Sequence, residues 1–259
     1  MVHFVGAGPG AKDLITLRGK KLMEEADVII YAGSLVNPQL LEYAPDHCSI
    51  HDSKDLNLEE VIAIMREAES QGKNTVRLHT GDPSIYGAIR EQMDVLEELG
   101  IAYDVTPGVS SFCGAAAALK MEYTLPGISQ SVIITRMDGR TKVPERESVE
   151  ALASHGATMV FFLSSSDSGR LSERLINAGL SSDTPCAVVY KATWDDEKSF
   201  VCSLKSLAGT MEANDIKKTA LIIVGEAVSQ TGYERSKLYD PGFTTEYRMG
   251  TDKNAKDGH

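Results

Sequence analysis

Near its N-terminus the sequence reads Val2-His3-Phe4-Val5-Gly6-Ala7-Gly8-Pro9-Gly10, a short apolar run that breaks into a glycine loop. We expect a strand, then the loop, then a helix, because glycine supplies the backbone freedom that such a turn needs. Backbone N–H groups of the loop can approach a ligand closely, and the positive end of a helix favours anionic groups. The stretch therefore predicts a ligand-binding loop at the end of the first strand.

The same loop also fits a degenerate dinucleotide-binding pattern, Gly6-x-Gly8-x-x-Ala11. That pattern requires an acidic residue at the end of the second strand, about 20 residues further on, to bind a ribose. The predicted second strand, 27–31, instead runs into Ala32-Gly33-Ser34. A nicotinamide-dependent reductase is therefore an alternative without its main support.

Composition excludes several classes of protein. The chain has 259 residues, a net charge of -11 and no cluster of Lys and Arg that could neutralise a row of phosphates, so we expect no nucleic-acid partner. No apolar segment approaches the ~20 residues that span a bilayer, and we expect a cytoplasmic protein without membrane contact. The cysteines and histidines lack the spacing of metal ligands or of a disulfide framework, so no metal is predicted.

Apolar, β-branched runs alternate with segments of helical period, which is typical of parallel sheets covered by helices. The fold class is α/β, with two α/β domains, each a mostly parallel or mixed sheet flanked by helices. We expect domains at 1–122 and 123–240, and a mobile polar tail at 241–259. Strands are predicted at 2–5, 27–31, 75–79, 102–106, 131–135, 158–163, 186–190, 198–203 and 219–224, and helices at 58–71, 85–99, 113–119, 147–154, 168–178 and 204–212.

Three further loops follow predicted strands, where open α/β sheets bind ligands. They are Thr80-Gly81-Asp82-Pro83-Ser84-Ile85-Tyr86-Gly87, Thr106-Pro107-Gly108-Val109-Ser110-Ser111 and Tyr190-Lys191-Ala192-Thr193-Trp194. Each has a purely structural alternative: a turn in which Ser84 caps the next helix, serine capping at Ser110, and a solvated Lys191 beside a core aromatic. Their coincidence favours a ligand site.

Together these residues resemble the tetrapyrrole methylase family, whose members transfer methyl groups from S-adenosylmethionine to uroporphyrinogen-derived rings. The resemblance covers 1–228 and rests on four motifs in order: Val5-Gly6-Ala7-Gly8-Pro9-Gly10 with Asp13-Leu14-Ile15-Thr16, Gly81-Asp82-Pro83-x-x-Tyr86-Gly87, Pro107-Gly108-Val109-Ser110-Ser111, and Thr219-Ala220-Leu221-Ile222-Ile223-Val224-Gly225. Three more stretches are similar to the members that methylate carbon 11 of precorrin-4 or cobalt-precorrin-4 in cobalamin synthesis: 31–36, 135–140 and 190–194.

The resemblance implies a ligand trough between the two domains, bound S-adenosylmethionine, S-adenosylhomocysteine as product, a tetrapyrrole substrate and a homodimer. Carried over by motif, the implied cofactor contacts are Pro9, Thr80, Gly81, Asp82, Ile85, Tyr86, Ser110, Ser111, Leu163, Tyr190, Lys191, Ala192, Thr219, Ala220 and Leu221. Substrate contacts are expected at Gly8, Arg18 and Arg136, where Arg18 and Arg136, with Lys191, are candidate partners for the carboxylates of the ring.

A sulfonium methyl is already a strong electrophile, so alignment of the reacting atoms matters more than acid or base catalysis, and no catalytic residue is assigned.

Alternatives keep the fold but change the substrate to uroporphyrinogen III, precorrin-2, a modified histidine of a translation factor or a ribose of ribosomal RNA. The RNA substrate conflicts with the acidic charge. Ala32-Gly33 replaces an aspartate of the uroporphyrinogen methylases and disfavours that substrate. A non-catalytic binder of tetrapyrrole or S-adenosylmethionine is the alternative of another class.

Overall fold

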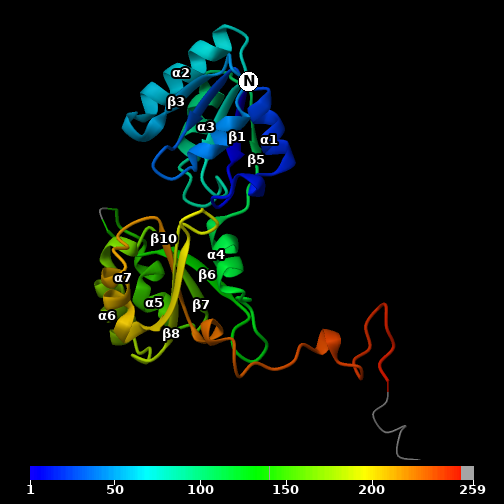
Figure 1. Ribbon diagram of the computed structural model, residues 1–259, viewed down its shortest axis with the longest axis vertical. Helices are drawn as coiled ribbons and strands as arrows, with labels where there is room; N and C mark the ends of the chain where they lie inside the picture. Colours follow the sequence, from blue (N-terminus) through cyan, green and yellow to red (C-terminus); the bar gives the residue numbers. More distant parts are fainter. Residues whose placement is uncertain (140, 252–259) are drawn as a thin grey trace, which may run out of the picture. The chain divides into compact units, whose positions relative to one another are not determined.

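The computed structural model describes residues 1–139 and 141–251 and divides into two compact units (Figure 1). The first unit comprises Met1–Lys120, Val188–Phe200 and Glu212–Leu221, and the second unit comprises Met121–Ala187, Val201–Met211 and the chain from Ile222 onward. The predicted mobile tail at 241–259 lies outside the described residues from 252 on. Within its described part, the Thr251 amide donates to the Pro241 carbonyl at 2.7 Å.

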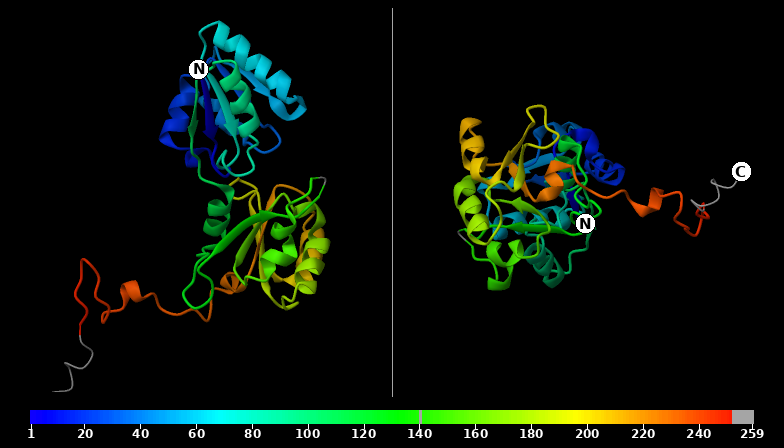
Figure 2. Two further views of the ribbon diagram at one scale, coloured as in Figure 1. Left: turned by 180° about the vertical axis from the view of Figure 1, so that it is seen from behind. Right: turned by 90° about the horizontal axis from the view of Figure 1, so that it is seen from below.

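The first unit contains a parallel sheet of five strands in the order β3-β2-β4-β1-β5. Its elements are β1 (Val2–Gly6), α1 (Leu17–Glu24), β2 (Val28–Tyr31), β3 (Ser49–Asp52), α2 (Leu58–Ser70), β4 (Thr75–His79), α3 (Arg90–Glu98), β5 (Tyr103–Thr106) and α4 (Ser111–Leu119). Helices flank this sheet on both sides (Figure 2).

Alternating side chains give the first sheet two different apolar faces. Phe4 and Ile30 pack with Met65 of α2 in one buried cluster, which also holds residues of α3. Val5 and its neighbours on the other face pack with Met23 of α1. The two faces are therefore covered by different crossover helices.

This arrangement places a topological switch point between β1 and β4. The two strands are neighbours and run parallel, yet the chain leaves β1 through α1 on one face and leaves β4 toward α3 on the other. Ligands of open α/β sheets bind outside the carboxyl ends of strands at such a point. The fold thus directs attention to the loops that follow Gly6 and His79.

The second sheet has the order β6-β7-β10-β8-β9, with β6 parallel and β10 antiparallel to β7. The predicted class, two mostly parallel or mixed sheets flanked by helices, is confirmed. The elements are β6 (Val132–Arg136), α5 (Val149–Ala153), β7 (Thr158–Phe162), α6 (Ser168–Asn177), β8 (Pro185–Tyr190), β9 (Lys198–Ser203), α7 (Leu207–Ala213) and β10 (Ala220–Val224).

Two details of the first unit differ from the sequence prediction. Strand β3 was not predicted, because Ser49–Asp52 is a polar edge strand without an apolar run. The predicted helix at 85–99 starts only at Arg90, because Tyr86 and Ala88 adopt left-handed backbone angles, φ 57° and 49°. Ser84 consequently caps no helix here, and its amide donates to the Asp82 carboxylate at 2.9 Å instead.

Candidate functional site

Backbone hydrogen bonds join the loops that follow β1 and β4. The Gly8 amide donates to the Gly81 carbonyl at 3.2 Å, and the Gly81 amide donates back to Gly8 at 2.8 Å. The loop after β5 joins them, because the Gly108 amide donates to Oδ2 of Asp82 at 2.9 Å. Three of the four predicted ligand loops are therefore held together at the carboxyl edge of one sheet.

Two glycines of the first loop lie in close contact with other segments of the chain. A Cβ on Gly6 would lie 2.5 Å from the Gly108 nitrogen and 2.7 Å from the Gly81 oxygen. A Cβ on Gly10 would overlap the Trp194 ring, 2.5 Å from its Nε1. We expected these glycines to admit a ligand, but at both positions they admit another part of the chain.

The Asp82 carboxylate is an organising group of the joined loops. It accepts bonds from the Gly108 amide and from both the amide and hydroxyl of Ser84. Burial alone would raise the pKa of Asp82, but these donors outweigh it and hold the pKa below its ordinary value. Asp82 is thus an ionised acceptor that fixes backbone, which is a positioning role.

The segment 190–197 adjoins the glycine loop within the first unit. The Thr193 hydroxyl accepts from the Ala11 amide at 2.9 Å, and Nε1 of Trp194 donates to the Pro9 carbonyl at 3.3 Å. The Lys191 amide donates to the Thr219 carbonyl at 2.9 Å. The structure therefore brings three of the predicted contacts, Pro9, Lys191 and Thr219, into one connected set of loops.

The purely structural alternative treated Lys191 as a solvated charge, but the structure shows that its ammonium group has partners. Its ammonium nitrogen lies 2.6 Å from Oδ2 of Asp196, and 5.1 Å from the centre of the Trp194 ring. The hydrogen bond that the ammonium donates to Asp196 is the main reason why the pKa of Lys191 is raised. The group is a persistent cation supported by an aromatic face.

Left-handed backbone conformations gather at the predicted cofactor residues. Among the described residues, those other than glycine with positive φ include Tyr86 (57°), Leu163 (51°), Lys191 (47°) and Thr219 (57°). Such conformations cost of order 1 kcal/mol and cluster at ligand sites, where the surrounding structure maintains them. Leu163 directly follows β7, Lys191 directly follows β8 and Thr219 directly precedes β10, whereas Tyr86 lies within the loop between β4 and α3.

The start of α4 presents two of the predicted hydroxyl residues. Ser110 occupies the N-cap position, but within 1–139 and 141–251 its side chain makes no capping bond to α4. The capping alternative is therefore not observed. Ser110 is buried, and Ser111 is the first helical residue, so the positive end of α4 adjoins the loop of Gly81, whose Cβ would lie 3.3 Å from the Ser111 nitrogen.

Not every predicted site residue joins these loops. Arg18 is exposed on α1. Leu163 and Arg136 belong to the second unit, where Leu163 is 64% exposed at the end of β7. The Arg136 guanidinium donates to the backbone carbonyls of Thr141 and Lys142 at 3.1 and 3.0 Å. Arg136 thus stabilises its own loop through the donors that would otherwise bind substrate carboxylates.

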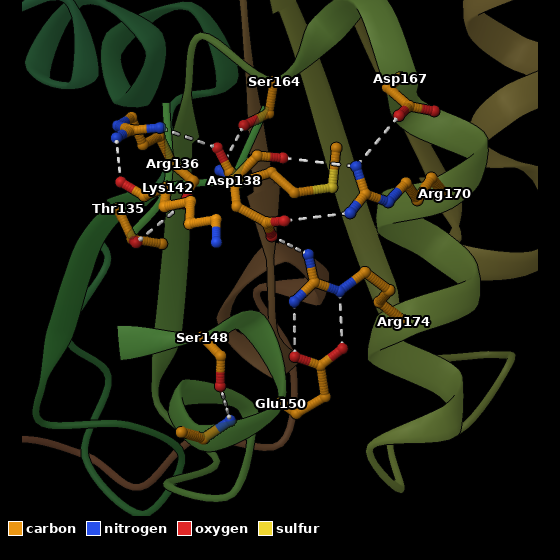
Figure 3. A network of polar contacts seen from close by, with 12 residues as sticks. Thr135, Arg136, Asp138, Lys142, Ser148, Glu150, Ser164, Asp167, Arg170 and Arg174 are labelled. Atoms are coloured by element: carbon orange, nitrogen blue, oxygen red, sulfur yellow. Dashed lines mark hydrogen bonds and ion pairs between the residues drawn. The ribbon is translucent and has the colours of Figure 1, made fainter. Parts of the chain in front are cut away.

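The stretch after β6 is further fixed by an ionic network, which Figure 3 shows. Asp138 accepts from Arg174 and, at 3.0 Å, from Nη2 of Arg170. Arg174 also forms a bidentate pair with Glu150, with both N–O distances 2.6 Å. Arg174 lowers the pKa of both carboxylates. The network joins the loop after β6 to α5 and α6.

Two polar residues of β4 were missed by the sequence prediction. Arg77 and His79 are buried on the α2 and α3 side of the sheet, beside a cavity of about 270 Å³ that Thr80, Ile85 and Tyr86 also line. Burial lowers the pKa of His79 to about 3, with a smaller contribution from Arg77, so the ring is neutral. Within the described chain, its Nε2 is buried without a partner. The available signal was the presence of two ionisable side chains, Arg77 and His79, within a five-residue strand.

The described residues lack two other features. Within 1–139 and 141–251, no group of three or more His, Cys, Asp or Glu side chains is arranged to hold a metal ion. Over the same ranges, no helix combines the length and the apolar character that crossing a membrane requires.

Comparison with known proteins identifies the family. The family described as Tetrapyrrole (Corrin/Porphyrin) Methylases matches residues 1–208. The chain belongs to the tetrapyrrole methylase family. The resemblance drawn from the four motifs is therefore confirmed.

Relatives within this family match nearly the whole chain. A cobalt-precorrin-4 C(11)-methyltransferase of Methanocaldococcus jannaschii is 54% identical over 252 residues, which cover 97% of each chain. The crystal structure of a cobalt precorrin-4 methyltransferase is similar with a TM-score of 0.86 and 45% identity, covering 88% of this chain and 95% of that one. A uroporphyrin-III C-methyltransferase of Thermus thermophilus, complexed with S-adenosyl homocysteine, shares the fold at a TM-score of 0.74 and 24% identity, covering 89% and 99%.

Proposed function

We propose that this tetrapyrrole methylase is an S-adenosylmethionine-dependent C-methyltransferase of cobalamin biosynthesis. It methylates carbon 11 of precorrin-4 or cobalt-precorrin-4 and gives the corresponding precorrin-5. The observation that carries the proposal is the 54% identity with the Methanocaldococcus jannaschii enzyme over 97% of both chains. Such extensive identity makes retention of the substrate class the expected outcome.

The residues at the carboxyl edge of the first sheet fit the proposed cofactor. The start of α4 offers positive backbone dipoles and the Ser110 and Ser111 hydroxyls to a carboxylate, because the Ser110 side chain is not spent on capping. Outside that sheet, Ala192 after β8 and Leu221 in β10 are buried apolar residues of the proposed set. The full proposed set is Pro9, Thr80, Gly81, Asp82, Ile85, Tyr86, Ser110, Ser111, Leu163, Tyr190, Lys191, Ala192, Thr219, Ala220 and Leu221.

S-adenosylmethionine, when bound, supplies an electrophilic sulfonium methyl group. The protein's task is then to fix the reacting carbon behind the S–CH₃ bond and to exclude water, which is worth about 7–11 kcal/mol when the alignment is good. Loops joined by backbone bonds between Gly8 and Gly81, and by Asp82 to Gly108, are suited to such positioning. We assign no general base.

The carboxylates of the ring need cationic partners on an acidic protein. We propose Lys191 and Arg18 for this role, with Arg136 and the backbone of Gly8 as further contacts. Arg136 already donates to three carbonyls of its own loop, at 3.0 to 3.2 Å. Replacing Arg136 with alanine tests its role, and Arg66→Ala, an exposed position on α2, is the matched control. Unchanged turnover and substrate affinity in Arg136→Ala would remove it from the site.

The proposal also includes a homodimer in the cytoplasm, which rests on the family resemblance and on composition. Light scattering coupled to size-exclusion chromatography measures the mass of the particle. A mass near 28.0 kDa at micromolar concentration contradicts the dimer.

The activity is tested directly with methyl-labelled S-adenosylmethionine. Purified protein is incubated with precorrin-4, cobalt-precorrin-4, precorrin-2 and uroporphyrinogen III separately, and NMR locates the label on the product. Label at carbon 11 of one of the precorrin-4 forms is the expected result, and comparison of the two forms decides whether the substrate carries cobalt. Label on precorrin-2 or uroporphyrinogen III alone reassigns the substrate, and binding without label on any ring indicates a non-catalytic binder.

A pair of lysine variants links this activity to the site. Lys191 and Lys205 each form an ion pair, at 2.6 Å with Asp196 and at 2.5 Å with Asp183, but only Lys191 lies in the proposed site. Lys191→Met should weaken binding of S-adenosylhomocysteine or of the ring at least tenfold, measured by calorimetry. Lys205→Met should leave both affinities unchanged. Equal effects of the two variants would contradict the placement of the site.

A further inference from the structure

Two cysteines of the second unit lie in contact. Cys186 on β8 and Cys202 on β9 belong to neighbouring strands of the second sheet, and their sulfur atoms are 3.3 Å apart. All four cysteines of the chain are free thiols in this structure. The short separation therefore belongs to a reduced pair that already faces across two strands.

The two thiols differ in accessibility. Cys186 is fully buried, whereas Cys202 is partly exposed on β9, the edge strand of its sheet. A reagent from solution therefore reaches Cys202 first. The Cys186 sulfur contacts the Cys202 sulfur from the buried side of the pair.

The surroundings also shift the pKa values of the two thiols in opposite directions. The bond with Cys186 and the hydroxyls of Thr210 and Ser206 lower the pKa of Cys202. The same contact with Cys202, together with burial, raises the pKa of Cys186. A thiolate is the nucleophilic form of cysteine, so the accessible sulfur is also the more readily ionised one.

We propose that Cys186 and Cys202 form a reversible thiol–disulfide exchange site, with Cys202 as the attacking and Cys186 as the resolving sulfur. The oxidant is a low-molecular-weight disulfide such as oxidised glutathione. The inference is independent of the proposed methyltransferase function, because both cysteines lie outside the residues assigned to cofactor and substrate.

The exchange balances in two steps. The Cys202 thiolate attacks one sulfur of the small disulfide, whose S–S bond breaks and releases one thiolate, leaving a mixed disulfide on Cys202. The Cys186 sulfur then gives up its proton and attacks the Cys202 sulfur, which releases the second small thiolate. Two protein thiols are oxidised, one small disulfide is reduced to two thiols, and the two protons pass to the released thiolates.

Bond formation requires little movement. The sulfur atoms must approach from 3.3 Å to about 2.05 Å, a change of about 1.3 Å. Cys48 and Cys113 serve as internal controls, since Cys113 is exposed on α4 and burial raises the pKa of both thiols. Selectivity for the pair over exposed Cys113 cannot arise from accessibility alone.

The test uses the full chain in buffers of reduced and oxidised glutathione. After alkylation of the remaining thiols, peptide mass spectrometry should find one link, between Cys186 and Cys202, that dithiothreitol removes. Cys48 and Cys113 should be alkylated. The absence of this link even in oxidised glutathione alone, or predominant modification of Cys113, overturns the proposal.

Order of attack is tested with variants and with the unmodified chain. Cys186→Ser should accumulate one glutathione on Cys202, whereas Cys202→Ser should leave Cys186 unmodified; the reverse pattern contradicts the assigned roles. In the unmodified chain, which avoids any folding defect, iodoacetamide should alkylate Cys202 faster than Cys113 at pH 7. Slower alkylation of Cys202 contradicts its role as the attacking thiol.

Discussion

Replacing Asp82 with alanine removes the side chain that joins the loops after β4 and β5. The carboxylate accepts from the Gly108 amide at 2.9 Å and from the Ser84 amide at 2.9 Å, and also from the Ser84 hydroxyl. The bond to Gly108 spans two loops distant in sequence, whereas those to Ser84 are local and partly exposed. The variant therefore tests how firmly the carboxyl edge of the sheet is organised.

The loss of stability expected for Asp82→Ala follows from the hydrogen bonds that the variant lacks. Leaving the half-buried Gly108 amide without a partner costs about 1–3 kcal/mol, and losing the two bonds to Ser84 costs about 1 kcal/mol together. Asp82→Ala should therefore lower the free energy of unfolding by about 2–4 kcal/mol. Asp82→Asn keeps one oxygen acceptor and should lose about 1 kcal/mol. Exposed Asp55 provides the control, since Asp55→Ala should change stability by less than about 0.5 kcal/mol.

Urea unfolding followed by circular dichroism measures these differences at pH 7. Because the pKa of folded Asp82 lies below its ordinary value of 3.8, the ionised carboxylate adds stability above that pH. That contribution is lost as the pH falls through the folded pKa, so the gap between the native protein and Asp82→Asn should narrow in acid. An Asp82→Ala protein as stable as Asp55→Ala, or a gap that widens below pH 4, would refute the reasoning.

Three further outcomes are expected. Gly10→Ala should cost about 1–3 kcal/mol and change Trp194 fluorescence, because its Cβ would overlap that ring, and an unaltered spectrum and stability would contradict the packing. Gly209→Ala should gain about 0.5–1 kcal/mol in thermal or urea unfolding, because the site lies within α7 with open space around it, and a loss would contradict this. Arg174→Met should cost about 1 kcal/mol at pH 7. Because Arg174 lowers the pKa of both folded Glu150 and folded Asp138, that cost should vanish as the pH falls through the two lowered pKa values, and a pH-independent difference would contradict an ionic origin.

Local signals predicted much of the fold. The start of α2 was predicted because Asn57 and Glu60 can bond reciprocally, and both bonds are present at 2.9 and 2.8 Å. The strand after it, Thr75–His79, was predicted from its place after that helix, in a chain where strand and helix segments alternate. These features depend only on residues a few positions apart, which is why the sequence displays them.

Features that depend on residues far apart in the sequence were harder to predict from the sequence. Tyr86 and Ala88 lie within the helix predicted at 85–99, but both adopt a left-handed backbone, which local helix preference does not predict. Asp82 was identified as a loop residue, yet its partner Gly108 lies 26 positions away. Arg77 was not predicted as a site residue because it lies inside a strand and not in a loop, and only the structure reveals the cavity beside it.

The close contact of Gly6, Gly81 and Gly108 has a consequence for mutational scanning. A Cβ on Gly6 would meet backbone atoms of the other two glycines at 2.5 to 2.7 Å, and backbone cannot rotate away as a side chain can. Every substitution at Gly6 should therefore reduce the amount of folded protein. A screen that measures only total activity would then find Gly6 as intolerant of substitution as a residue that contacts the ligand. Separating abundance from affinity in such a screen would reveal Gly6 as a determinant of abundance alone.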